Sequence, residues 1–206
     1  IFISLFSNVV LGNFSRPEGV LDELKKAAEK NEDLRIVFLA DPTFQERLKP
    51  FLMEGMQVEY IQKRSPQGIF YKIFHFFYSY LIFTGTTRIL ATMGARADIP
   101  PAGGNRRLAF LKSFVANTFG RIKFIKTKFV PWIFANKYAS RSYAPLFDKY
   151  RPDLVFVPNI IFSPDLDLIV EAKKRGIRTV GMACNWDHLN KYFIPLRSDW
   201  LLVQNE

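Results

Sequence analysis

Apolar runs alternate with amphipathic segments along the first third of the chain. The pattern predicts three strands, at residues 1–7 (IFISLFS), 34–40 and 56–61, and two helices, at 17–30 and about 43–53. The continuous apolar run at 34–40 is typical of a strand that is covered on both faces. Strands and helices in this alternation indicate parallel βαβ units with right-handed crossovers.

The same alternation returns in the last third. It predicts three more strands, at residues 152–158, 177–183 and 199–205, and a helix at 165–176. Asp165 lies in the first turn of this helix and Lys173 and Lys174 lie in its last, where their charges suit the helix dipole. We therefore expect an α/β fold with one doubly wound, mostly parallel, Rossmann-like sheet of six strands.

Residues 66–149 separate the two halves and are rich in aromatic and basic side chains. Helical spacing is seen at 66–94 and 108–119, proline and glycine predict a loop at 99–107, and Pro131 is expected to bend or end a helix that begins near 121. The chain is thus predicted to be a single domain, residues 1–206, with a helical insertion at 66–149.

Charge is distributed unevenly along the 206 residues, whose formal net charge is +10. Between Gln62 and Lys149 there are fifteen Lys or Arg against only Asp98 and Asp148. Cations interleaved with aromatic residues favour an anionic membrane surface, so we expect peripheral association through residues 66–134. No apolar window reaches the length of about 18 residues that crosses a bilayer. The alternative is that these helices merely thicken the core, with their lysines in water.

The sequence lacks the motifs of several common kinds of enzyme and cofactor site. The sequence has no G-x-G-x-x-G after the first strand, no Walker A motif, no G-x-S-x-G elbow and no H-E-x-x-H. Cys184 is the only cysteine and the two histidines are scattered, so neither a disulfide nor a zinc site is predicted. No metal and no cofactor is expected. The opening IFISLF predicts a strand rather than a signal peptide, and we expect a cytoplasmic protein.

Ligands of doubly wound sheets bind at the carboxyl ends of the strands. The loops expected there are 8–16, 41–43, 62–66, 159–164, 185–191 and the tail after 203. They supply candidate substrate-binding residues and two candidate acid–base residues, namely Asn13, Arg16, Asn159, Asn185, Trp186 and Lys191, with Asp187 and His188. Other interpretations stay open: Asp187 can cap a helical turn, Trp186 can belong to the core, and His188 can be an exposed loop residue.

Four segments of the last third follow one another in a recognisable order. They are PDLVFVPN at 152–159, AKKRGIRTVG at 172–181, CNWDHLNK at 184–191 and SDWLLVQNE at 198–206. This order resembles the amino-terminal half of GT-B-type glycosyltransferases, especially bacterial ones of the surface-polysaccharide type. The likeness covers about residues 150–206, is weaker over 1–61 and is absent between them. Asn185 stands where that family more often has serine, and Tyr192 where a glycine is expected.

The resemblance implies a division of labour between two Rossmann-like domains. The first takes the acceptor, a lipid-linked or surface-polymer molecule, and the second binds the nucleotide-sugar donor without a metal. A donor-binding domain is accordingly expected after residue 206, and residues 1–206 alone should be inactive. Within the same fold, a CDP-glycerol-type glycerophosphotransferase or a nucleotide-sugar epimerase is an alternative. A non-enzymatic nucleic-acid-binding protein is an alternative of another class, supported only by the basic middle segment, so nucleic acid is not the expected partner.

Overall fold

The computed structural model describes residues 1–62, 68–82, 84, 108–161, 163–183, 189 and 193–203. The chain divides into two compact units. Unit 1 comprises Ile1–Ser65, Ser140–Cys184 and Leu196–Glu206, and unit 2 comprises Pro66–Ala139 and Asn185–Pro195.

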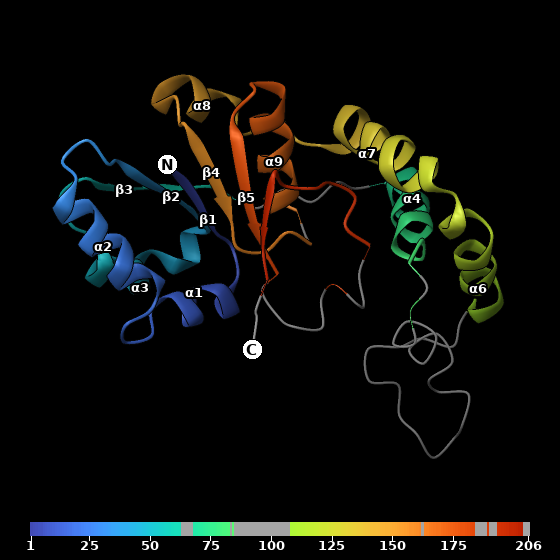
Figure 1. The fold of residues 1–206 in the computed structure, drawn as a ribbon, viewed down its shortest axis with the longest axis horizontal. Coiled ribbons are helices and arrows are strands. Elements are labelled where there is room, and N and C mark those ends of the chain that lie inside the picture. Colours follow the sequence, from blue (N-terminus) through green and yellow to red (C-terminus); the bar gives the residue numbers. More distant parts are fainter. Residues whose placement is uncertain are drawn as a thin grey trace, which may run out of the picture. The chain divides into compact units, whose positions relative to one another are not determined.

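Unit 1 is built on a six-stranded sheet in which all neighbouring strands are parallel (Figure 1). Its strands are β1 (Phe2–Leu5), β2 (Ile36–Ala40), β3 (Met56–Tyr60), β4 (Leu154–Val157), β5 (Arg178–Met182) and β6 (Trp200–Leu202). They lie in the order β3-β2-β1-β4-β5-β6. This is a Rossmann-like strand order, and the predicted α/β class with a six-stranded doubly wound sheet is confirmed.

Side chains of β1 alternate between the two faces of the sheet, and each face has its own helices. Ile3 and Leu5 pack in one buried cluster with α1 (Asn8–Phe14), α2 (Val20–Lys30) and α3 (Gln45–Leu48). Phe2, on the opposite face, meets the rings of Phe147 and Tyr150 from α8 (Ala144–Tyr150) at centroid distances of 5.1 and 5.8 Å. The central strands are therefore covered on both faces, as their continuous apolar runs predicted.

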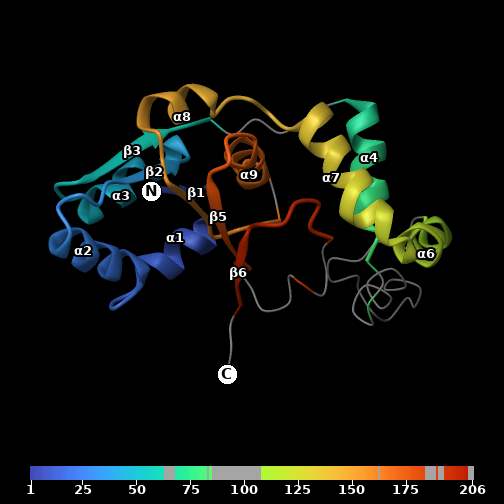
Figure 2. The ribbon, with the colours of Figure 1, turned by 45° about the horizontal axis from the view of Figure 1, so that its top comes forward.

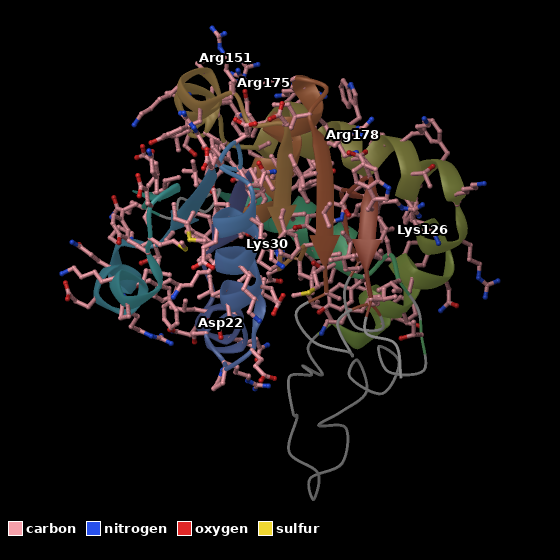
Figure 3. All side chains as sticks on the ribbon, turned by 60° about the vertical axis from the view of Figure 1, so that its left-hand side comes forward. Asp22, Lys30, Lys126, Arg151, Arg175 and Arg178 are labelled. Atoms are coloured by element: carbon pink, nitrogen blue, oxygen red, sulfur yellow. The ribbon has the colours of Figure 1, made fainter. Side chains whose placement is uncertain are left out.

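The helices of unit 1 carry charges that match their dipoles and their neighbours. Asp22 and Lys30 lie at opposite ends of α2, in its first and last turns (Figure 3). Arg175 follows the last residue of α9 (Asp165–Lys174) and bonds both Glu171 of α9, at 2.7 Å, and Asp148 of α8, at 2.5 Å. This cation fixes α8 beside α9 on the same face of the sheet.

Two details of the predicted elements differ from the structure. Residues 8–16 were expected to form a loop, but α1 begins at Asn8. Val10, Leu11 and Phe14 have the spacing that buries one side of a helix on the sheet. The helix expected at 43–53 is broken into η1 (Pro42–Phe44), α3 and η2 (Lys49–Phe51), where the prolines favour short 3₁₀ turns.

Unit 2 is helical in the part that the structure describes. Its elements are α4 (Ile69–Ser79), α6 (Ala109–Asn117), η3 (Phe119–Arg121), and then η4 (Ile125–Phe129), α7 (Val130–Ile133) and η5 (Phe134–Tyr138), which follow without a break (Figure 2). Aromatic rings hold them together: Phe74 stacks on Tyr138 at 4.9 Å and Phe77 meets Phe119 at 5.4 Å. The described helices include none with the length and apolarity needed to cross a bilayer.

Pro131 does not end the helix in which it lies. It belongs to α7, and the helical path continues to Tyr138. The turns before and after α7, η4 and η5, are π-helical, and such wider turns shift the backbone hydrogen-bond ladder so that a residue without an N–H is accommodated. Whether residues 66–149 form an insertion in a single domain stays a prediction.

Asp199 attaches the edge strand β6 to β5. Its carboxylate accepts hydrogen bonds from the backbone N–H of Thr179, at 2.8 Å, from the Thr179 hydroxyl, at 2.9 Å, and from Lys173 Nζ, at 3.0 Å. Partial burial acts to raise the pKa of Asp199, but the bonds from Lys173 and Thr179 outweigh it and lower that pKa. Thr179 is fully buried, so its N–H depends on this carboxylate.

Replacing Asp199 by alanine should lower the free energy of unfolding of the protein by about 1–3 kcal/mol, because a buried donor loses its acceptor. The lowered pKa means that this contribution is present above the ordinary carboxyl range and is lost as the pH falls through the folded-state value. Urea denaturation at neutral and acidic pH measures both effects. Asp33→Ala, on an exposed turn, is the control and should change stability by less than about 0.5 kcal/mol. A loss of stability that is the same at every pH would contradict the role of the ionised carboxylate.

Candidate functional site

The order of the strands marks one place in unit 1 where a ligand can bind. β1 and β4 are neighbours, but the chain leaves β1 toward β2 and leaves β4 toward β5 on the other side. Their following segments, α1 and the loop to α9, therefore diverge at the carboxyl edge of the sheet. Doubly wound folds bind ligands at such a switch point.

The loop between β4 and α9 brings two buried oxygens to this edge. Asn159 is 8% exposed, and neither its Oδ1 atom nor the Oγ atom of Ser163 has a hydrogen-bond partner within the described part of the chain. A buried oxygen without a partner costs about 1–3 kcal/mol. Such atoms in a native fold require an explanation, and a bound molecule or water that donates to them is the usual one.

A buried polar cluster lies at the start of α9 and fixes this loop. The Ser4 hydroxyl of β1 donates to Asp165 at the first position of α9, and both side chains are buried. The carboxylate of Asp167, two residues further along α9, accepts from the backbone N–H of Ser140 at 3.2 Å. The central strand is thus tied directly to the helix that follows Asn159 and Ser163.

Burial changes the pKa values of two groups in this cluster, Asp167 and Tyr143. Burial raises the pKa of Asp167 to about 7, although the bond from Ser140 opposes the change. Burial also raises the pKa of Tyr143 well above its usual value, with the charges of Asp165 and Asp167 adding to the effect. Among the residues described, the Tyr143 hydroxyl has no hydrogen-bond partner. The cluster is therefore a buried acidic environment close to the loop, not an exposed catalytic pair.

The β1 side of the switch point carries an exposed cation. Arg47 of α3 donates from Nη1 to the Oδ1 atom of Asn8, the first residue of α1, at 2.6 Å. Its guanidinium also lies 5.8 Å from the ring centroid of Phe44. A guanidinium held in this way is suited to phosphate or carboxylate groups.

The predicted site residues have different outcomes. Asn159 lies in the loop after β4 as expected. Asn13 lies within α1, about 7.5 Å beyond Asn8 along the helix at about 1.5 Å per residue, and Arg16 is exposed beyond its end. The other five candidates, Asn185, Trp186, Asp187, His188 and Lys191, lie outside the described residues, and their roles stay predictions.

Some residues of the candidate site are absent from the sequence-based set. Ser4 carried a signal, since it is a polar residue in the apolar run IFISLF, and so did the acidic pair of DLDLIV at 165–170. The bond between Asn8 and Arg47 joins positions 39 apart, and no local pattern indicates it.

Unit 1 is thus an α/β unit of the Rossmann-like class, in which two buried oxygens at the switch point have no partner among the described residues. Among the described residues, no three His, Cys, Asp or Glu side chains come together where they could hold a metal ion. Neither a scan against models of protein families nor a search of curated proteins finds a match for this chain.

The raised pKa of Asp167 predicts how stability depends on pH. The folded state holds the Asp167 proton more tightly than the unfolded state, whose pKa is near 3.8, so this carboxyl's contribution is full in acid and is lost as the pH rises toward about 7. Asp167→Asn, which cannot ionise, should therefore gain stability over the wild type as the pH rises from 4 to 8, by up to about 4 kcal/mol for a shift of about three pKa units.

Urea denaturation at several pH values in this range measures the difference between the two proteins. Asp33→Asn is the matched control and should follow the wild type throughout. A stability difference between Asp167→Asn and the wild type that does not vary with pH would show that Asp167 is ionised in the fold.

Proposed function

We propose that residues 1–206 form the acceptor-binding half of a GT-B-type glycosyltransferase, which transfers a sugar from a nucleotide-sugar donor to a lipid-linked or surface-polymer acceptor. The observation that carries the proposal lies at the switch point of the Rossmann-like sheet: within the part of the chain that the structure describes, the buried oxygens of Asn159 and Ser163 have no hydrogen-bond partner. The resemblance of residues 150–206 to the amino-terminal half of such enzymes supports the same conclusion.

The chemistry of these groups suits a hydroxyl-rich acceptor. An amide oxygen and a hydroxyl oxygen are neutral acceptors, which pair well with the O–H groups of a sugar or polyol. A site whose buried polar groups are satisfied only by the right hydroxyl also discriminates strongly against molecules that lack it. Arg47, on the β1 side of the switch point, supplies a cation for the phosphate of a lipid-linked acceptor.

The transfer itself needs a base. The acceptor oxygen forms a bond to the anomeric carbon of the donor sugar, the bond from that carbon to the nucleotide diphosphate breaks, and the base takes the acceptor proton. We propose Asp187 or His188 for this role, since a carboxylate or an imidazole can accept a proton near neutral pH. Binding of the donor is assigned to a second domain, because the segment after β1 lacks a glycine-rich phosphate loop.

The proposal predicts the effect of removing the Asn159 amide from the natural protein that contains this chain. Asn159→Leu should lower kcat/KM for the acceptor at least tenfold, since a lost hydrogen bond to the substrate is worth about 1–3 kcal/mol, and leave KM for the donor unchanged. The fold should persist, because the wild-type oxygen has no partner within the described chain. Asn31→Leu, at the opposite edge of the sheet, is the matched control and should behave as the wild type.

The assay uses uridine, guanosine and cytidine diphosphate sugars, together with CDP-glycerol, against short lipid-linked and oligosaccharide acceptors. If CDP-glycerol were the only donor turned over, the protein would be a glycerophosphotransferase of the same fold and not a glycosyltransferase. Conversion of a nucleotide sugar without any acceptor would identify an epimerase. If Asn159→Leu had the same kcat/KM for the acceptor as the wild type, the acceptor would not bind at the switch point.

A further inference from the structure

Helix α6 of unit 2 presents its side chains the wrong way round for a helix in water. Phe110 is 86% exposed and Phe114, one turn later, is also exposed. Lys112 of the same helix is only 5% exposed, and its ammonium group lies 5.0 Å from the ring centroid of Tyr80. A helix at a water-exposed surface buries its phenylalanines and exposes its lysines. The outer face of α6 is therefore built for an apolar environment.

Helix α4 has both buried and exposed apolar residues. Its inner side is already used, because Phe74 and Tyr78 are buried and contact the rings of Tyr138 and Phe134. Two other apolar residues of α4 are exposed: Phe70, in the first turn of the helix, is 76% exposed, and Ile73 is 59% exposed. The core of unit 2 thus does not account for these two residues.

The continuous helix that contains α7 adds a third exposed pair. Phe124 and Trp132 are both exposed, and Lys128 lies midway between them along the helix. Residues four apart share one side of a helix. We call the six exposed residues Phe70, Ile73, Phe110, Phe114, Phe124 and Trp132 the outer apolar set.

Charges around the outer apolar set have one sign. The described residues of 68–139 include no Asp or Glu, but they include Lys72, Arg121, Lys123 and Lys128, all exposed, and Lys126 on η4 (Figure 3). Aromatic side chains prefer the interface between lipid and water, and anionic lipids attract basic segments. None of the described helices is long and apolar enough to cross a bilayer.

We infer that unit 2 docks on an anionic lipid bilayer, such as the cytoplasmic leaflet of a membrane, through the outer apolar set and the lysines beside it. A second copy of the chain fits this surface less well, because it would bring the same positive charges together. A nucleic acid would use the lysines and the aromatic rings, but it gives no reason to expose Ile73. The inference rests on unit 2 and does not depend on the proposed transfer reaction.

Sedimentation with vesicles of neutral phosphatidylcholine, or of phosphatidylcholine with about 30% phosphatidylglycerol, tests the inference on the full chain. The wild type should pellet with the anionic vesicles and stay in the supernatant with the neutral ones. Lys123→Gln/Lys126→Gln/Lys128→Gln should weaken binding at least tenfold, because each basic residue near an anionic surface contributes about fivefold. Lys25→Gln/Lys26→Gln/Lys30→Gln, on α2 of unit 1, makes the same change in charge and should stay within about twofold of the wild type.

The apolar part of the surface is tested separately. Phe110→Ser should reduce vesicle binding about tenfold at constant charge, and because the Phe110 side chain is 86% exposed the thermal unfolding curve should be retained. Phe70→Ser/Ile73→Ser is a second variant for the case that α6 does not tolerate the change. Equal recovery from neutral and anionic vesicles would overturn the inference. The inference would also be overturned if the chain self-associated without vesicles and the serine variants abolished that association. Binding to polyuridylate, with no binding to vesicles, would overturn it as well.

Discussion

The burial of β1 on both faces is the constraint on which the rest of unit 1 depends. β1 lies in the middle of the sheet, between β2 and β4, and its side chains pack alternately against α1 on one face and α8 on the other. Each fully buried large apolar side chain contributes about 1.5–3 kcal/mol. Because both faces must be covered, the chain runs to one side of β1 in its first part and to the other side from β4 onward. The switch point between β1 and β4 is a direct consequence of this arrangement.

A single polar residue in the central strand connects this core with the candidate site. Ser4 is buried among apolar residues and donates to Asp165, which begins the helix after the β4 loop. The bond between Ser4 and Asp165 holds the start of α9 against β1. It thereby fixes the position of the loop that carries Asn159 and Ser163. A site that recognises hydroxyl groups needs such preorganisation, since acceptor atoms on a mobile loop lose much of their binding free energy when they are ordered.

The fold could be predicted from the sequence because its strong signals are local. Apolar runs such as 34–40 gave all six strands, and the charges at the ends of α9 gave its limits within two residues. The first helix was missed because Asn8, Gly12 and Asn13 are typical loop residues, while the burial of Val10 and Phe14 is a tertiary effect. Of the site, Asn159 was predicted from its place after a strand. Arg47 and Tyr143 could not be, because their positions depend on packing between segments that are distant in sequence.

The central claim is that the carboxyl edge of the sheet at β1 and β4 binds a hydroxyl-rich acceptor. Hydrogen exchange of the natural protein, with and without saturating oligosaccharide or lipid-linked acceptor, tests it most directly. We predict slower exchange of the backbone amides in the loop after β4, near Asn159 and Ser163, and unchanged exchange in the turn at 31–35, at the opposite edge of the sheet. Slower exchange confined to other segments, with the β4 loop unaffected, would contradict it.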